Sequence, residues 1–422
     1  MKLKKYSFHN AKNGNLKTCQ ISNRSDLEEV LDLGFQPLGD SLLTKDQLNQ
    51  PETYYPLKLL RSKSLGHSQL SYVVPGNLVY HMEYPYKCGV TAEVVMHHKQ
   101  QSKKNVKTLN LKKNSLIIDI GSNDGTLLNE YKKLGMKVIG VEPTNMAKYA
   151  NKRGIKTIQA PFNLKIAKKI TKYSGKAKLI TATNVFAHMS SLGDVMIAIK
   201  EALDKDGSFI FENHYMVDII KHNQYDTIYH EHIRNYSLKS LIYLFNLYSL
   251  KVIDCEVLDR YNGSIKVVVS NNKKTRPSPR VNKTLSNEKK FGLTNKKIWD
   301  KFRINTKKSK EDLVNLLYKL KKNNKTIVGN SCPCRSSVLL NYCGIGKDLI
   351  PYIAEQPTSA KLGLYLPGKH IPIVNNRVLV KDQPDYILLL AWHYAKPIIK
   401  YLKNMGVKSK FIIPLPKVKI VK

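Results

Sequence analysis

The sequence predicts an α/β protein with two lobes, each built around a doubly wound, mostly parallel sheet. Short apolar runs alternate with helical patterns over about residues 115–213, and the same alternation returns over about residues 325–416. Several of the helical stretches end at a glycine, the residue favoured just past the end of a helix. The first hundred residues lack this alternation, are rich in turns, and are expected to form a small irregular domain.

The first lobe begins with the run SLIIDIG, whose continuous apolar character is typical of a strand buried on both faces of a parallel sheet. The run is short and bounded by a glycine turn, which favours a strand over a buried helix. Helical spacing follows, and strands and helices then alternate. The expected strands are 115–121, 136–142, 178–184 and 207–213, and the expected helices are 126–135, 145–154 and 194–207.

The segment 271–310 is polar, contains prolines and then becomes strongly basic, so it is expected to be a linker that precedes an amphipathic helix over 311–323. A second α/β unit follows. Its expected strands are 325–330, 385–392 and 410–416, and its expected helices are 336–344 and 395–406. The predicted domains are therefore an N-terminal domain (1–90), a first α/β domain (91–275), a linker and helix (276–320) and a C-terminal lobe (321–422).

The charge balance is extreme, with 70 Lys and Arg against 32 Asp and Glu and a net charge of +38. Such a field attracts polyanions, so nucleic acid is a hypothesis to weigh. The excess is mostly lysine spread over the whole chain, without an arginine-rich tract interleaved with aromatic residues. A phosphorylated small molecule would suit the same field, and no nucleic-acid partner is expected.

Location and assembly have few sequence signals. No apolar run approaches the ~20 residues that span a bilayer, and the basic start lacks the apolar segment of a secretory signal. Six scattered cysteines in 422 residues do not form a disulfide framework. We therefore expect a reduced, cytoplasmic protein without a membrane partner, as a monomer or homodimer.

The stretch DIGSNDGTLL follows a predicted strand and opens a predicted helix. Gly121 and Gly125 would allow a tight turn and a close approach to a ligand. Asp119 and Asp124 add carboxylates, with Asn123 between the glycines. A phosphate loop normally avoids negative charge, because its helix N-terminus holds an anion. Acidic groups suit instead a cationic, hydroxyl-rich ligand, and S-adenosylmethionine carries a sulfonium, an ammonium and a ribose diol.

Two further positions support this cofactor. Glu142 and Pro143 end the second strand, where a carboxylate accepts hydrogen bonds from ribose hydroxyls. Asn184 ends a later strand, on the same ligand-binding edge of the sheet. The turn lacks the G-x-G-x-x-G pattern of dinucleotide sites, which favours S-adenosylmethionine over NAD.

Several motifs together resemble the nucleotide-sugar C-methyltransferases, which methylate a carbon of a 4-keto deoxysugar carried on a nucleoside diphosphate, typically at C-3. The resemblance covers nearly the whole chain, and its most specific elements are YHEH and PGKHIPI. The matching stretches are LDLGFQPLGDSLL, YYPLKLL, DIGSNDGTLL, GVEP, DTIYHEH, LLNYCGI, LGLYLPGKHIPI and DYILLLAW.

The resemblance implies a small N-terminal zinc-binding domain, a Rossmann-like S-adenosylmethionine domain and a second Rossmann-like lobe that helps to hold the nucleotide sugar. It also implies the chemistry: a base removes the acidic proton beside a ketone, and a donor stabilises the enediolate oxygen. Matched residue by residue, His232 resembles the base, Tyr229 the donor and Glu231 an orienting carboxylate, while His188 and Tyr84 resemble further active-site residues. If this stretch is helical, Tyr229 and His232 share one face and His230, a structural residue, points elsewhere.

The chain departs from the family at the zinc site. The family uses two C-x-x-C pairs, a spacing suited to tetrahedral zinc. The corresponding positions here are Cys19, Ser22, Ser62 and Leu65, so three of the four thiolates are missing. We predict no structural zinc and no other metal.

The last lobe departs as well. Its turn GNSCPCRSS stands where the family tends to have a Gly/Ala-rich turn with a lysine, and Arg335 is the candidate to supply that positive charge. Cys332 and Cys334 form a C-x-C pattern that by itself is weak support for a metal or redox site. Lys369 and His370, in the retained PGKHIPI element, are candidates for contact with the diphosphate or the sugar. His393 stands where the family more often has asparagine.

The leading hypothesis is therefore a C-methyltransferase for a nucleotide-linked keto sugar, with the nucleotide sugar as its small-molecule partner. An RNA or DNA methyltransferase is the alternative that the charge suggests. A catalytically inactive binding scaffold is the third hypothesis, which the loss of the cysteines favours and the retention of Tyr229, Glu231 and His232 opposes.

Overall fold

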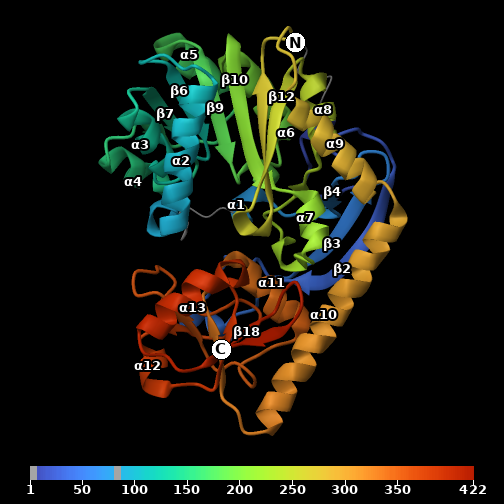
Figure 1. Cartoon of the computed structure of the whole chain (residues 1–422), viewed down its shortest axis with the longest axis vertical. Helices are drawn as coiled ribbons and strands as arrows, with labels where there is room; N and C mark the ends of the chain where they lie inside the picture. The colour runs from blue at the N-terminus through green and yellow to red at the C-terminus, as the bar shows by residue number, and fades with distance from the viewer. Residues whose placement is uncertain (1–6, 80–86) are drawn as a thin grey trace.

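The computed structural model describes residues 7–79 and 87–422. Figure 1 shows a central α/β part, a second α/β lobe and a smaller strand-rich part that lie against one another, so no single sheet organises the described chain. Four sheets account for the strands, with seven, six, four and two members. The predicted α/β class is confirmed.

The largest sheet has the strand order β12-β13-β10-β9-β6-β7-β8. Its five strands from β8 to β10 are parallel, whereas β13 pairs antiparallel with both β10 and β12. Every residue of β6 is buried, as its apolar sequence predicts for a central strand. The strands are β6 (Leu116–Ile120), β7 (Lys137–Val141), β8 (Thr157–Ile158), β9 (Ala177–Thr183), β10 (Leu203–His214), β12 (Lys251–Leu258) and β13 (Ser264–Ser270).

Helices connect these strands and begin where local hydrogen bonds favour them. The side chain of Asn163 accepts a hydrogen bond from the backbone N–H of Ile166 at the start of α5. Ser237 and Ser240 form a capping box at the start of α8. The helices are α2 (Ala92–Thr108), α3 (Thr126–Lys133), α4 (Met146–Lys152), α5 (Leu164–Ser174), α6 (Leu192–Ala202), α7 (Met216–Lys221) and α8 (Leu238–Leu247).

The N-terminal part is more regular than expected. It contains an antiparallel sheet of order β11-β4-β3-β2, in which β2 (Leu27–Gln36), β3 (Tyr55–Ser62) and β4 (Ser68–Leu70) come from the N-terminal segment. Residues 225–233, which contain the YHEH motif, form the YHEH stretch. The edge strand β11 (Arg234–Asn235) directly follows this stretch and pairs with β4. The remaining elements are the pair β1 (Gly14–Asn15) with β5 (Tyr72–Val73), and α1 (Gly76–Val79). The N-terminal sheet therefore holds the end of the YHEH stretch in place.

The second lobe has the strand order β16-β15-β14-β17-β18-β19, parallel except for the last pair. Its strands are β14 (Ile327–Asn330), β15 (Ile353–Glu355), β16 (Ile373–Asn375), β17 (Tyr386–Leu389), β18 (Lys410–Ile413) and β19 (Lys419–Val421). Its helices are α11 (Cys334–Cys343), α12 (Val378–Asp382) and α13 (Ala395–Asn404).

Most of the segment expected to be a linker is helical, so that expectation is wrong. Two helices, α9 (Pro279–Phe291) and α10 (Lys296–Lys322), occupy it, and the much longer α10 includes all but the last residue of the predicted helix 311–323. Helix α10 runs along one side of the molecule from the N-terminal sheet to the second lobe (Figure 1). Its buried side chains, among them Trp299, Phe302 and Leu313, recur at helical spacing along the basic sequence.

One hydrophobic core joins parts that are distant in sequence. It contains leucines of the N-terminal sheet, Tyr225 and Ile228 from the start of the YHEH stretch, Trp299 of α10 and the apolar strands of the second lobe. Two other clusters fill the central α/β part. The YHEH stretch is thus packed against the core of the second lobe. No helix of the described ranges is long and apolar enough to cross a membrane.

Candidate active site

A cavity of about 600 Å³ lies where the carboxyl ends of the central strands face the N-terminal part and the second lobe. Parallel α/β sheets bind ligands at this edge. Of the residues that the sequence analysis selected, the cavity is lined by Asp119, Gly121, Asn123, Glu142, Pro143, Asn184, His188, Tyr229, Glu231, His232 and Arg335. The fold therefore brings most of the predicted cofactor residues and most of the predicted catalytic residues to one space.

The glycine turn after β6 has a backbone that suits close approach to a ligand. Gly121 has φ +67° and Asn123 has φ +50°, both in the left-handed region that glycine and asparagine tolerate best. A Cβ on Gly121 would lie 2.5 Å from Cγ1 of Val185. The turn is fixed to the next strand, because the N–H of Gly121 donates to the carbonyl of Val141 at 2.8 Å. A larger residue at position 121 would therefore collide with Val185 and distort this turn.

Glu142, directly after β7, is buried and already accepts three hydrogen bonds from the protein. Its Oε2 accepts from the N–H of Asn123 at 2.9 Å. Its Oε1 accepts from the N–H and the hydroxyl of Thr144 at 2.9 and 2.7 Å. Each carboxylate oxygen has two lone pairs, so Oε2 keeps one acceptor position for a ligand hydroxyl.

Asp119 and Asn184 lie at the ends of neighbouring strands. Burial raises the pKa of Asp119 to about 7, although the hydroxyl of Thr181 donates to its carboxylate at 2.6 Å. Asn184 has φ +55°, and its Oδ1 is buried without a hydrogen-bond partner among the described residues. Buried acceptors beside a glycine turn fit the ribose and cationic groups of S-adenosylmethionine.

Two predicted cofactor residues are absent from the lining of the cavity. Asp124 instead stabilises the start of α3, since its carboxylate accepts from the N–H and the hydroxyl of Thr126 at 3.2 and 2.6 Å. It also accepts from the N–H of Gly89 at 3.0 Å. Gly125 has φ +77°, and a Cβ there would lie 3.1 Å from side-chain carbons of Ile155. Both residues shape the loop from outside the cavity.

The YHEH stretch is not an α-helix, so the helical condition under which Tyr229 and His232 were expected to share one face is not met. Residues 225–227 form a 3₁₀ turn, and a second turn follows in which the N–H of His232 donates to the carbonyl of Tyr229 at 2.8 Å. This turn still brings the two side chains together. The Tyr229 hydroxyl donates to Nε2 of His232 at 2.9 Å, and the ring centroids are 4.0 Å apart.

A backbone carbonyl, that of Thr227, holds His232 in one tautomer. Nδ1 lies 2.7 Å from the carbonyl oxygen of Thr227. Because a carbonyl only accepts hydrogen bonds, Nδ1 carries the proton and Nε2 is left as the basic nitrogen. Burial, followed by the neighbouring histidines, holds the pKa of His232 well below its usual value. The ring is therefore a neutral base with its lone pair on Nε2.

The rings of two further histidines lie beside the His232 ring. The ring centroids of His188 and His214 lie 4.9 and 5.2 Å from that of His232. Burial lowers the pKa of His188 to about 4 and that of His214 to about 3. Burial likewise raises the pKa of Tyr229 well above its usual value, so the phenol keeps its proton. The site can therefore offer neutral bases and a hydroxyl donor near pH 7.

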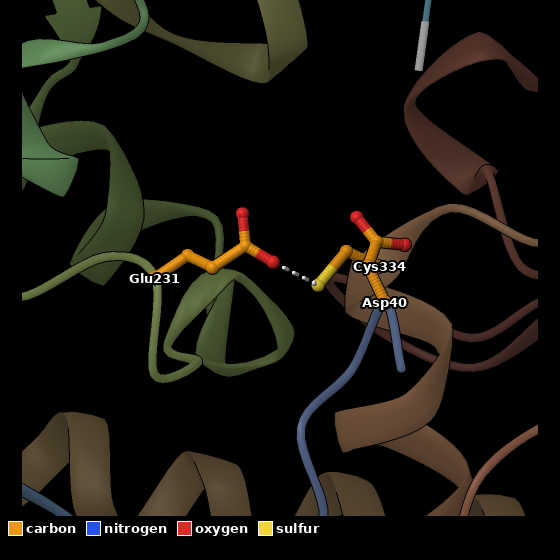
Figure 2. Close-up of side chains that lie close together, drawn as sticks. All are labelled: Asp40, Glu231 and Cys334. Atoms are coloured by element: carbon orange, nitrogen blue, oxygen red, sulfur yellow. Dashed lines mark hydrogen bonds between the residues drawn. The ribbon is translucent and has the colours of Figure 1, made fainter. Parts of the chain in front are cut away.

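Glu231 meets residues from two other parts of the chain, as Figure 2 shows. The Cys334 thiol donates to its Oε1 at 3.7 Å, and Asp40 approaches the same place, so that ligand atoms of all three side chains lie within 4.8 Å of one another. Nζ of Lys361 lies 3.2 Å from Oδ1 of Asp40. Burial raises the pKa of the Cys334 thiol well above its usual value. Because Asp40 is already paired with Lys361, we assign no metal to these three side chains.

Among the described residues, three cationic side chains line the cavity, the buried Arg335 and the partly buried Arg260 and Lys361, and each is paired with a carboxylate. Arg260 binds Glu212 at 2.8 Å, Arg335 binds Asp226 at 2.9 Å, and Lys361 binds Asp40. The positive charge expected from Arg335 is therefore present at the cavity, but it is balanced by a buried acid.

Two of the predicted substrate-binding residues lie outside the cavity lining. His370 pairs with Glu52 of the N-terminal part, and neither Lys369 nor His370 lines the cavity. The His230 ring packs edge-on against Tyr55 at a centroid distance of 5.9 Å, although it also borders the cavity. Tyr84 lies outside the described residues.

The sequence analysis missed several residues of the cavity wall. His214 ends β10 directly, so the rule that selected Asn184 at a strand end could have found it. Tyr261, with φ +54°, stacks on the His214 ring at 5.4 Å and comes from the turn between β12 and β13. Asp40, Arg260 and Lys361 also line the cavity, but they come from loops whose sequences contain no local signal of a site.

The positions of the family's zinc ligands do not fit a zinc ion. Cys19 accepts from the N–H of Ser22 at 3.3 Å and lies 3.7 Å from Nε2 of His67. The Ser62 hydroxyl donates to the carboxylate of Asp26 at 3.1 Å. The Leu65 side chain has no ligand atom, so a tetrahedral set is incomplete. Hydrogen bonds occupy the place where thiolates would bind metal.

Three family models match successive parts of the chain. They are described as "Putative zinc binding domain" for residues 19–80, "Methyltransferase domain" for residues 96–254 and "C-methyltransferase C-terminal domain" for residues 260–416. The C-methyltransferase NovU of Streptomyces niveus is 31% identical over 411 residues, which are 96% of this chain and 96% of that protein.

Two solved structures are each similar to less than half of the chain. The 1,6-didemethyltoxoflavin-N1-methyltransferase of Burkholderia thailandensis, bound to S-adenosylhomocysteine, is 14% identical and covers 44% of this chain and 81% of its own, with a TM-score of 0.33. An S-adenosylmethionine-dependent methyltransferase of Aquifex aeolicus is 16% identical and covers 42% of this chain and 97% of its own, with a TM-score of 0.30. The full-length match to NovU and the three successive domain matches give the identity: the chain belongs to the family of S-adenosylmethionine-dependent C-methyltransferases.

Proposed function

We propose that this enzyme methylates C-3 of a 4-keto deoxysugar linked to a nucleoside diphosphate, by way of an enediolate. The observation that carries the proposal is the state of His232. Its Nδ1 proton is held by the Thr227 carbonyl at 2.7 Å, which leaves Nε2 as a base in the same cavity as Gly121 and Glu142. A neutral imidazole with a free Nε2 can accept the proton that is removed from a carbon beside a ketone.

In the proposed reaction Nε2 of His232 takes the proton from the sugar carbon, and the electron pair of the broken C–H bond moves toward the ketone oxygen. The Tyr229 hydroxyl, now 2.9 Å from Nε2, would turn to that oxygen and donate to it as negative charge develops. When bound, S-adenosylmethionine would supply the electrophilic methyl group for this carbon and would leave as S-adenosylhomocysteine, which keeps the electron pair of the broken C–S bond. The proton on Nε2 then passes to solvent, so the site returns to its neutral state.

The remaining residues have proposed supporting roles. Glu142 would accept a ribose hydroxyl of the cofactor, and Asp119 and Asn184 would border its amino acid and nucleoside parts. Glu231 and His188, whose Oε2 and Nδ1 lie 3.6 Å apart, would contact or orient the sugar. In this proposal Arg335 is the nearest equivalent of the family's lysine for the diphosphate, whereas Lys369 and His370 would act only on parts of a ligand that extend beyond the cavity.

The test combines isotope exchange with product analysis. The protein is incubated in deuterated water with S-adenosylhomocysteine and a panel of nucleoside-diphosphate 4-keto-6-deoxysugars, and loss of the proton beside the ketone is followed by NMR. With S-adenosylmethionine, a long-range ¹H–¹³C spectrum places the new methyl group. We expect exchange and methylation at C-3. Methylation at C-5 would overturn the position, and transfer only to RNA would overturn the substrate class.

The matched variants are His232→Asn and His222→Asn. His222 also places Nδ1 against a backbone carbonyl, that of Asn262 at 2.8 Å, but it does not line the cavity. Loss of exchange is expected in His232→Asn and not in His222→Asn. If His232→Asn exchanges the proton at the wild-type rate, His232 is not the base.

A further inference from the structure

A buried ion pair joins the second lobe to the YHEH stretch. Asp226 is fully buried, and its carboxylate accepts from Nη2 of Arg335 at 2.9 Å and from the indole Nε1 of Trp392 at 2.7 Å. Both donors belong to the second lobe, in α11 and in the turn after β17. Hydrogen bonds to a charged group are among the stronger ones in proteins, especially where water is excluded.

Arg335 is itself fixed from several sides. Its Nη2 also donates to Gln224 at 3.1 Å, its Nη1 lies 3.1 Å from Nδ1 of His393, and its guanidinium lies 5.2 Å from the centre of the Trp392 ring. Such a buried cation depends on its partner acid, because an unpaired charge in the interior is costly. Asp226, Arg335 and Trp392 therefore act as one unit.

Asp226 directly precedes the residue that sets the tautomer of His232. It lies in the 3₁₀ turn Tyr225–Thr227, and the carbonyl of Thr227 accepts the Nδ1 proton of His232. The turn is packed from behind by α11: the Tyr225 hydroxyl lies 3.6 Å from Sγ of Cys343. A shift of this turn would move the Thr227 carbonyl away from Nδ1.

We propose that Asp226 and Trp392 are positioning residues through which the second lobe keeps the Nδ1 proton of His232 on the Thr227 carbonyl and Nε2 free to act as base. This inference rests on the proposed function for the identity of the base. If the Thr227 carbonyl is displaced, the proton can occupy Nε2 instead, and a protonated Nε2 cannot remove a proton from the sugar. The second lobe then has a part in the chemical step besides any contact with the nucleotide.

Asp226 does not act as a catalytic residue in this scheme. It is absent from the lining of the cavity, whereas its neighbour Thr227 is part of it. Donors from the second lobe engage both carboxylate oxygens, since Arg335 binds Oδ1 and Trp392 binds Oδ2. The carboxylate thus acts through the backbone that follows it.

The mild test is Trp392→Phe, which keeps an aromatic ring under Arg335 and removes only the N–H that donates to Asp226. The stronger test is Asp226→Asn, which keeps one acceptor oxygen and turns an NH₂ group toward one of the two donors. For Trp392→Phe we expect kcat to fall about tenfold, the size that loss of one hydrogen bond to a charged group gives. The KM for S-adenosylmethionine should change less than twofold, because the cofactor turn is untouched.

The decisive readout is the tautomer of His232 in ¹⁵N-histidine NMR spectra, where the His232 signal is identified by its loss in His232→Asn. Wild type should show the Nδ1-protonated form, and both variants should show a larger Nε2-protonated population. The matched control is Glu288→Gln, which removes the charge of another buried acid that binds the Tyr215 hydroxyl at 2.9 Å, outside the cavity. It should lower thermal stability without changing the tautomer.

Four outcomes decide the inference. An unchanged His232 tautomer in Trp392→Phe overturns the inference. It is also overturned if Glu288→Gln and Trp392→Phe, when they lose the same thermal stability, lose the same fraction of kcat. A shifted tautomer supports it, and Trp392→Phe alone decides if Asp226→Asn does not fold. Because the NMR measurement needs no sugar, a shifted tautomer in an enzyme that turns over none of the keto sugars would support the positioning role and refute the proposed substrate.

Discussion

Replacing Glu142 by glutamine is expected to weaken binding of the cofactor by about 10- to 100-fold. Three of the four lone pairs of the carboxylate are occupied by protein donors: Asn123 N–H on Oε2, and Thr144 N–H and hydroxyl on Oε1. One position on Oε2 is therefore left for one ribose hydroxyl. A hydrogen bond to a charged group contributes about 1.5–3 kcal/mol, and each 1.4 kcal/mol is roughly a factor of ten in affinity.

Titration calorimetry with S-adenosylhomocysteine measures this loss without turnover. Glutamine also turns an NH₂ group toward a backbone N–H, so part of any loss could come from a distorted turn. A 2′,3′-dideoxy analogue separates the two effects, because it cannot make the ribose hydrogen bond. We expect Glu142→Gln to weaken binding of the natural nucleoside much more than binding of the analogue.

Thr144→Val is the matched control. It removes the hydroxyl that donates to Oε1 at 2.7 Å and keeps the shape of the side chain. It frees an acceptor position on Glu142, so affinity should stay equal or rise. The reasoning is refuted if Glu142→Gln changes the dissociation constant less than threefold, or if it weakens the natural nucleoside and the dideoxy analogue equally.

The remaining predictions concern pH and metal. Burial lowers the pKa of His9 to about 4 and that of His98 to about 3, whereas unfolded histidine titrates near 6.5. Below pH 6.5 the unfolded chain then binds more protons than the folded chain. The free energy of unfolding should therefore fall as the pH is lowered from about 6.5 to about 4, by at most ~1.4 kcal/mol per pH unit for each histidine. Urea titrations at pH 7 and pH 5 with equal midpoints would contradict this. Because the pKa of His232 is lowered, kcat/KM should begin to fall on the acid side only below pH 6.5. A pH–rate profile with an acid-side midpoint of 6.5 would show that the base is an ordinary exposed histidine. Leu65 offers no ligand atom, and hydrogen bonds occupy the site around Cys19. Purified protein should therefore contain less than about 0.1 zinc per chain, and EDTA should leave the melting temperature unchanged. One tightly held zinc per chain would refute the absence of a structural metal.

The cofactor side of the site could be predicted from the sequence because it follows strand periodicity. Asp119, Glu142 and Asn184 stand at or just after the ends of β6, β7 and β9, and these strands are neighbours in one parallel sheet. Residues at such positions must meet at one edge once the sheet forms. The same rule would have found His214 at the end of β10. It gives no information on Asp124, which lies in the same loop but binds α3 and Gly89.

Predictions for the catalytic stretch were right about proximity and wrong about its cause. A helix was considered as the means of bringing Tyr229 and His232 together, whereas two turns do so. Their i,i+3 spacing is compatible with both structures, so the sequence could not choose between them. The turns persist because Tyr225 and Ile228 enter the core of the second lobe and β11 joins the N-terminal sheet. Contacts of this kind lie far from the stretch in sequence.

The sequence alone determined the α/β class, the glycine turn with its acidic neighbours and the group of titratable residues in YHEH, because each depends on a pattern within a few tens of residues. Only the tertiary structure decided which nitrogen of His232 is the base, that Asp226 pairs with Arg335, and that Asp40 and Cys334 meet Glu231. Those features join segments as much as about three hundred residues apart along the chain. Burial then shifts their pKa values in ways that no local sequence pattern encodes.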